Sequence, residues 1–143
     1  MNLNPEVWGP HYWFMLHTLA LNYPKYPNAV TKKKYYDFIS NLPLFIPVEQ
    51  IATNFSKMID LYPITPYLDS KESFIKWVHF IHNKINESLH KPKISLHDFY
   101  VTYYEEYKPK EIKYKESNRW KEKLIYTITL VTTICLGLYL YNK

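Results

Sequence analysis

Apolar residues recur at intervals of three and four along residues 1–107, and this spacing predicts helices rather than strands. Four stretches carry the pattern. Their predicted buried positions are Trp8, Tyr12, Met15, Leu16 and Leu19; Tyr35, Tyr36, Phe38, Ile39 and Leu42; Val48, Ile51, Ala52, Phe55, Met58 and Ile59; and Phe74, Trp77, Val78, Ile81, Ile85 and Leu89. Prolines separate these stretches. The sequence therefore predicts an all-α fold, a four-helix bundle with a short fifth helix.

Pairs of polar residues three positions apart mark the starts of the last two helices. Asp69 with Glu72 has the spacing of a capping box ahead of the fourth helix. Ser95 with Asp98 has the same spacing ahead of the fifth helix, which we expect to run to about Tyr107.

The stretch from Leu124 to Tyr141 holds 18 residues without a charge. As a helix it would be ~27 Å long, which is close to the thickness of the hydrocarbon core of a bilayer. Aromatic residues lie near both of its ends, as expected where a span meets the membrane interfaces. We therefore predict a transmembrane anchor over residues 124–141, with a buried core helix as the alternative.

The lysine-rich segment 108–123 precedes this stretch, and we interpret it as a basic linker or a stalk near lipid headgroups, or as a solvated spacer. Its positive charge predicts that the helical domain, residues 1–107, lies on the cytoplasmic side. Residues Met1 to Pro10 are polar and interrupted by prolines, so we expect no signal peptide there. The expected topology is a single-pass, tail-anchored membrane protein.

Composition excludes several classes of function. The net charge of +5 arises from 18 basic and 13 acidic residues, and much of the excess lies in the linker, so we expect no nucleic-acid partner. With only Gly9 and Gly137, the chain has no glycine-rich phosphate loop. The single cysteine, Cys135, lies in the apolar C-terminal stretch, so no disulfide forms within the chain.

Polar residues gather on one side of the fourth predicted helix, beside its apolar stripe, and these residues are His79, His82, Asn83 and Asn86. On the first helix, His17 follows Trp13 by four positions and adds another ring. No carboxylate or cysteine stands at a ligand-like offset from the histidines, so a metal site is disfavoured. A flat polar ligand between aromatic and amide groups fits these residues better.

The stretches WGPHYWFMLHTLALNYP, PVEQIATNF and FIKWVHFIHNKINESLHKP resemble the Erv/Alr family of FAD-linked sulfhydryl oxidases, over about residues 5–105. The resemblance implies a four-helix bundle with a short fifth helix, FAD at its mouth, and usually a homodimer. It also implies electron transfer from substrate dithiols through a Cys-x-x-Cys pair to the flavin and then to oxygen. Large DNA viruses encode short members of the family, so by analogy a virion, its inner capsid layer or a viral assembly membrane is a reasonable location.

The resemblance also assigns cofactor contacts. The positions that match flavin-contacting residues are Gly9, Trp13 and His17 on the first helix, Trp77, His82, Asn83 and Asn86 on the fourth, and Lys91 after it. The chain departs from the family at Asn54, where histidine is common, and near Tyr103, where an arginine–tryptophan pair is usual. Asn54 can still form hydrogen bonds and Tyr103 can still stack. Whether FAD is retained stays open.

The largest departure lies where the family begins its third helix with Pro-Cys-x-x-Cys. Here Pro47 is followed by Val48, and Ile51 takes the second cysteine position. An alkyl side chain cannot supply the thiolate that this chemistry needs. Leu96 stands at the position of the family's cysteine after the fourth helix, so it offers no substitute. We therefore predict no catalytic residue.

The hypothesis that follows is a catalytically silent, membrane-anchored protein with a structural or partner-binding role, as a homodimer or with another protein. The alternative is an active FAD-linked thiol oxidoreductase that uses an external dithiol donor, and the polar face of the fourth helix motivates it.

Overall fold

The computed structural model describes residues 3–143, and its regular elements in that range are all helical. Residues 1 and 2, the start of the predicted helical domain, lie outside the described part. The chain divides into two compact units, Met1–Phe99 and Tyr100–Lys143.

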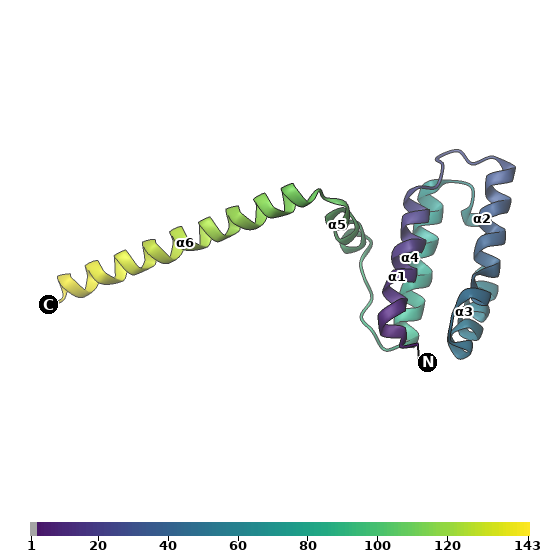
Figure 1. Ribbon diagram of the computed structural model, residues 1–143, viewed down its shortest axis with the longest axis horizontal. Helices are drawn as coiled ribbons and strands as arrows, with labels where there is room; N and C mark the ends of the chain where they lie inside the picture. The colour runs from purple at the N-terminus through teal and green to yellow at the C-terminus, as the bar shows by residue number, and fades with distance from the viewer. Residues whose placement is uncertain (1–2) are drawn as a thin grey trace. The chain divides into compact units, whose positions relative to one another are not determined.

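The first unit is a helical bundle, and the all-α prediction is confirmed. Its helices are α1 (Pro5–Leu21), α2 (Ala29–Asn41), α3 (Glu49–Leu61) and α4 (Lys71–Ser88), with the short 3₁₀ turns η1 (Leu42–Phe45) and η2 (Thr65–Tyr67) between them. The short fifth helix, α5 (Leu96–Tyr107), begins in this unit, as predicted. Figure 1 shows α1 and α4 side by side, and their packing is the most extensive between helices of the unit.

The buried stripe of α4 is the centre of this core. Phe74, Trp77, Val78 and Ile81 are each no more than 2% exposed, as predicted. Leu89 was predicted to be buried, but its side chain is 55% exposed because α4 ends just before it.

The predicted stripe on α3 faces inward but is only partly buried: Phe55 is the one buried residue of α3, and the other predicted positions are half-buried. Val48 and Ile51 are half-buried rather than in the core. The reason is that α3 packs mainly on η1 and only lightly on α4. On the outer faces of α1 and α2, Met15 and Tyr36 are also exposed, against expectation.

The start of α4 is capped by a residue other than the predicted one. Ser70 is the N-cap, and its Oγ accepts a hydrogen bond from the backbone N–H of Ser73 at 3.1 Å. Asp69, which was expected to form a capping box with Glu72, instead makes an ion pair with Lys32 of α2 at 2.6 Å. The N-cap of α4 therefore lies one residue after the predicted position.

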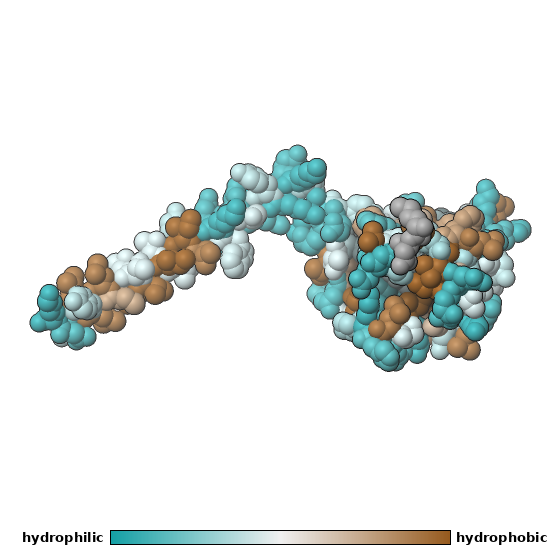
Figure 2. Space-filling model, turned by 60° about the horizontal axis from the view of Figure 1, so that its bottom comes forward, coloured by the Kyte–Doolittle hydropathy of each residue, from teal (hydrophilic) through white to brown (hydrophobic). Residues whose placement is uncertain are grey.

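The second unit contains α6 (Lys110–Tyr141), in which the predicted linker and the predicted anchor form one continuous helix. Among the described helices, α6 is long and apolar enough to cross a membrane. Figure 2 shows hydrophobic side chains over the C-terminal part of α6 and mostly hydrophilic ones over its N-terminal part. The predicted boundaries between domain, linker and anchor remain predictions.

The C-terminus of α4 carries a left-handed residue. His90 has a φ of 55°, and it follows the C-cap residue Leu89. The backbone N–H of His90 donates to the carbonyl of Glu87 at 3.1 Å, and that of Lys91 donates to the carbonyl of Asn86 at 2.8 Å. This pair of bonds is the Schellman motif, in which glycine is usually found at the left-handed position.

We predict that His90→Gly stabilises the first unit. Glycine avoids the steric cost of a Cβ at this φ, although it also makes the unfolded chain more flexible. The free energy of unfolding should rise by about 0.5–1 kcal/mol, measured by urea denaturation of the full chain in detergent. His90→Ala keeps the Cβ and is the matched control, and equal stability of the two variants would contradict the prediction.

Candidate functional site

Two histidines and two aromatic rings meet between α1 and α4. The Trp13 ring stacks on the His82 ring, with centroids 4.0 Å apart and planes 7° from parallel. One turn further along α1, the His17 Nε2 lies 2.9 Å from the Nδ1 of His82, close enough for a hydrogen bond. The Phe99 ring of α5 lies 4.4 Å from the His17 ring, measured between centroids. The residues Trp13, His17 and His82, predicted from the sequence, therefore share one site.

Both histidines of this pair are neutral at pH 7. Burial, followed by the charges of His82 and His79, lowers the pKa of His17 to about 3. Burial and the charge of His79 lower the pKa of His82 to about 4. In the neutral pair one ring N–H donates to the bare nitrogen of the other ring, so a single proton joins the two helices.

Asn86 lies one turn after His82 on α4, and it is only 8% exposed. Its backbone carbonyl accepts hydrogen bonds from the N–H groups of Leu89 and Lys91. Within residues 3–143, no hydrogen bond joins its carboxamide to another residue. Its amide atoms are not among the fully enclosed side-chain atoms of the described residues, so they remain open to a polar ligand.

The other predicted cofactor contacts differ in their surroundings. Trp77 belongs to the core, where its Nε1 donates to the Tyr62 carbonyl at 3.0 Å. Asn54 is exposed on α3, and its Oδ1 accepts from the Gln50 Nε2 at 3.2 Å. Gly9 is half-buried on α1.

Two further predicted contacts lie after α4. Lys91 is exposed in the connection to α5. Tyr103 belongs to the second unit, where it is buried, and burial raises the pKa of its phenol. Asn83, which is on α4 itself, is half-buried and bonded to the backbone of Ile94. The roles of these residues as cofactor contacts remain predictions.

Val48 and Ile51 lie at the N-terminus of α3. Val48 is the N-cap and makes no side-chain capping bond, and Ile51 lies in the first turn. A helix N-terminus favours an anion such as a thiolate, but neither alkyl side chain can ionise. The arrangement at this position therefore supports no nucleophilic chemistry.

Sequence reasoning missed Phe99, which covers His17. Phe99 follows the N-cap Ser95 of α5 by four positions, so an apolar residue there was a sign that the first turn of α5 packs inward. The sequence did not indicate which side chain it would meet.

The Erv1 / Alr family profile matches residues 10–108. A probable FAD-linked sulfhydryl oxidase of Acanthamoeba polyphaga mimivirus is 34% identical over 85 residues, which are 59% of each chain. The mitochondrial FAD-linked sulfhydryl oxidase ERV1 of Saccharomyces cerevisiae is 32% identical over 88 residues, or 62% of this chain and 46% of that protein. The chain thus spans about half of the length of such relatives.

Solved structures show the same fold. The crystal structure of the yeast Erv1 core superposes with a TM-score of 0.62 at 29% sequence identity, covering 66% of this chain and 79% of that one. The FAD-binding domain of Erv1 from Saccharomyces cerevisiae gives the same TM-score at 30% identity, covering 66% and 88%.

We predict that acid destabilises the first unit already at pH values well above the pKa values of the two histidines in the folded chain. Between pH 6.5 and pH 4 the unfolded chain binds protons at His17 and His82, whereas the folded pair does not. The stabilisation from the neutral pair is therefore complete above pH 6.5 and is lost as the pH falls through this window. With a discount for partial exposure, the free energy of unfolding should be roughly 2 kcal/mol lower at pH 5 than at pH 7.

The measurement is urea denaturation of the full chain across this pH range. The matched control is His82→Gln, which removes one of the two titrating groups and should reduce the slope of stability against pH by about half. An unchanged slope in a variant with both His17→Gln and His82→Gln would contradict the assignment.

Proposed function

The chain belongs to the Erv1 / Alr family, and we propose that it is a catalytically silent member that binds FAD, is anchored in a membrane and acts by contact with protein partners. The observation that carries the proposal is the pair of alkyl side chains, Val48 and Ile51, at the start of α3. The family resemblance puts the redox-active cysteines at these positions.

The absence of a thiol is the chemical reason for the silence. FAD, when bound, accepts electrons that a thiolate delivers and passes them to oxygen. The chain's one cysteine, Cys135, lies in the second unit, on the apolar part of α6, so it cannot serve as a redox pair. Valine and isoleucine side chains cannot form the disulfide that a substrate thiolate would attack, and they cannot supply the thiolate that would pass the two electrons on.

Binding of FAD is supported by the donor set around the histidine pair. The stack of Trp13 on His82 gives a flat aromatic surface, and the Asn86 carboxamide offers both a donor and an acceptor. These residues, with His17, fit a heteroaromatic ligand with a hydrogen-bonding edge. The relatives named as FAD-linked and the solved FAD-binding domain of yeast Erv1 support the same ligand.

A membrane location is supported by α6, whose basic first half is followed by an apolar stretch. The first unit would then face the cytoplasm or its equivalent. The viral relatives, from mimivirus and from Invertebrate iridescent virus 3, support a role in a virion or its assembly membrane. The proposed partner is a second copy of this chain or another protein.

The first test is an absorbance spectrum of the full chain purified in detergent, followed by an assay of dithiol-dependent oxygen consumption. We expect a flavin band near ~450 nm without oxygen uptake, because the cofactor is held but receives no electrons. A protein without the band would contradict FAD binding. A band together with turnover would overturn the silence and favour an active oxidoreductase that uses an external dithiol donor.

The second test restores the two thiols with Val48→Cys and Ile51→Cys together. Positions three apart in the first turn of a helix are close enough for a disulfide, and the helix N-terminus lowers a thiol pKa. Oxygen uptake should rise on the order of 10-fold or more above the original chain.

The two single variants are the matched controls, and they should stay at background because each lacks the partner thiol. A double variant that binds FAD and forms the disulfide, yet remains inactive, would show that another part of the chain blocks turnover.

A further inference from the structure

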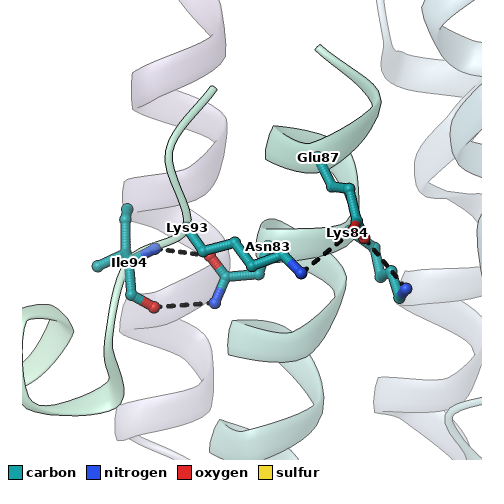
Figure 3. A network of polar contacts seen from close by, with 5 residues as sticks. All are labelled: Asn83, Lys84, Glu87, Lys93 and Ile94. Atoms are coloured by element: carbon teal, nitrogen blue, oxygen red, sulfur yellow. Dashed lines mark hydrogen bonds and ion pairs between the residues drawn. The ribbon is translucent and has the colours of Figure 1, made fainter. Parts of the chain in front are cut away.

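The connection between α4 and α5, residues 91–95, is tied to α4 by a side chain. The Oδ1 of Asn83 accepts a hydrogen bond from the Ile94 N–H at 2.9 Å, and its Nδ2 donates to the Ile94 carbonyl, also at 2.9 Å (Figure 3). The Nε2 of His79 lies 2.8 Å from the same carbonyl oxygen. The Asn83 Nδ2 also lies 3.2 Å from this nitrogen; in the tautomer with the proton on Nε2, His79 donates to the Ile94 carbonyl, and Asn83 then donates to that carbonyl alone.

The carboxamide of Asn83 is therefore occupied by the chain itself. One amide side chain offers an oxygen acceptor and an NH₂ donor, and both ends here bond to a single backbone residue, Ile94. The contrast is with Asn86, one turn further on, whose carboxamide makes no hydrogen bond to another residue within residues 3–143. The two asparagines of the same helix face thus have different surroundings.

The connection is also joined to α4 by an ion pair on the surface. Lys93 forms an ion pair with Glu87 at 3.1 Å, and Glu87 also pairs with Lys84 at 3.1 Å (Figure 3). Hydrogen bonds from these lysines lower the pKa of Glu87, but all three side chains are substantially exposed, and such pairs contribute little. The contacts of Asn83 and His79 instead converge on the backbone of one residue, Ile94, and together they form a side-chain link between it and α4.

The link matters because α5 starts immediately after it. The Oγ of Ser95 accepts the Asp98 N–H at 3.0 Å, which is the N-terminal cap expected from the sequence. The first turn of α5 then presents Phe99, only 4% exposed, to the ring of His17. Fixing Ile94 thus fixes the residue that covers the histidine pair.

We propose that Asn83 is a positioning residue, not a ligand contact: with His79 it fastens Ile94 to α4 and so holds Phe99 against His17. This assigns Asn83 a role different from the cofactor contact that the family resemblance implies. The link itself is independent of any ligand. Its effect on cofactor binding rests on the proposed FAD site, so the two are tested separately.

The first test uses the ¹⁵N-labelled full chain in detergent without added FAD. In Asn83→Ala, hydrogen exchange of the Ile94 amide should be several-fold faster, roughly 10-fold, because its acceptor is gone. The NMR signals of the His17 ring should also shift as the Phe99 ring moves. Unchanged Ile94 exchange and unchanged His17 signals would overturn the proposal.

Two variants make this test specific. Asn86→Ala, on the same helix, should leave Ile94 exchange as in the original chain, because the Asn86 side chain makes no bond to the connection. Asn83→Asp keeps an acceptor for the Ile94 N–H but places a carboxylate oxygen where Nδ2 met the Ile94 carbonyl oxygen, so repulsion between the two oxygens should shift the signal of the Ile94 carbonyl carbon. Should Asn83→Ala fail to fold, Asn83→Asp still decides, since an unaltered signal of the Ile94 carbonyl carbon would contradict the donor bond.

The second test measures FAD affinity by flavin fluorescence titration. Asn83→Ala and Phe99→Leu should each weaken binding several-fold, and the double variant should be no weaker than the single ones, because Asn83 acts through Phe99. Losses that multiply would indicate a direct contact of Asn83 with FAD and overturn the positioning role. If the original chain binds no FAD, the proposed function fails, while the exchange experiment still decides the link.

Discussion

The hydrogen bond between His17 and His82 is the constraint on which the candidate site depends. It joins two helices across 65 residues of sequence in the part of the bundle where α1 packs on α4. Because His17 is buried and His82 is half-buried, the neutral pair is favoured: protonation of one ring would place a positive charge between the helices, and protonation of both would place two charges side by side. Trp13 covers one ring and Phe99 the other, so the same contacts that exclude water also shape the site.

The start of α3 carries two alkyl side chains, and the helix forms there without a side-chain cap. Val48 and Ile51 are half-buried. Their apolar burial therefore stabilises the fold by less than the ~0.8 kcal/mol expected for each fully buried CH₂ group. Neither residue caps the helix, and α3 still begins immediately after Val48. The bundle therefore does not need thiols at these positions, and the polar site between α1 and α4 is built from other residues.

Several features could be predicted from the sequence because they depend on local patterns. The spacing of Phe74, Trp77 and Val78 predicted the buried face of α4, and Ser95 predicted the start of α5. The stacking of His82 on Trp13 could not be predicted, because it depends on the rotation of α1 against α4. The same holds for Asp69, whose partner Lys32 is brought near by tertiary packing.

The sequence by itself determined the helical class, the apolar C-terminal stretch and the lack of thiols near α3, since each follows from residue types and their spacing. Only the tertiary structure decided what each polar residue of α4 does. Asn83 and Asn86 look equivalent on a helical wheel, yet one bonds to the backbone of Ile94 and the other is buried without such a bond within residues 3–143. The physical reason is that hydrogen-bond partners are set by the path of the chain after the helix ends, which helical periodicity does not encode.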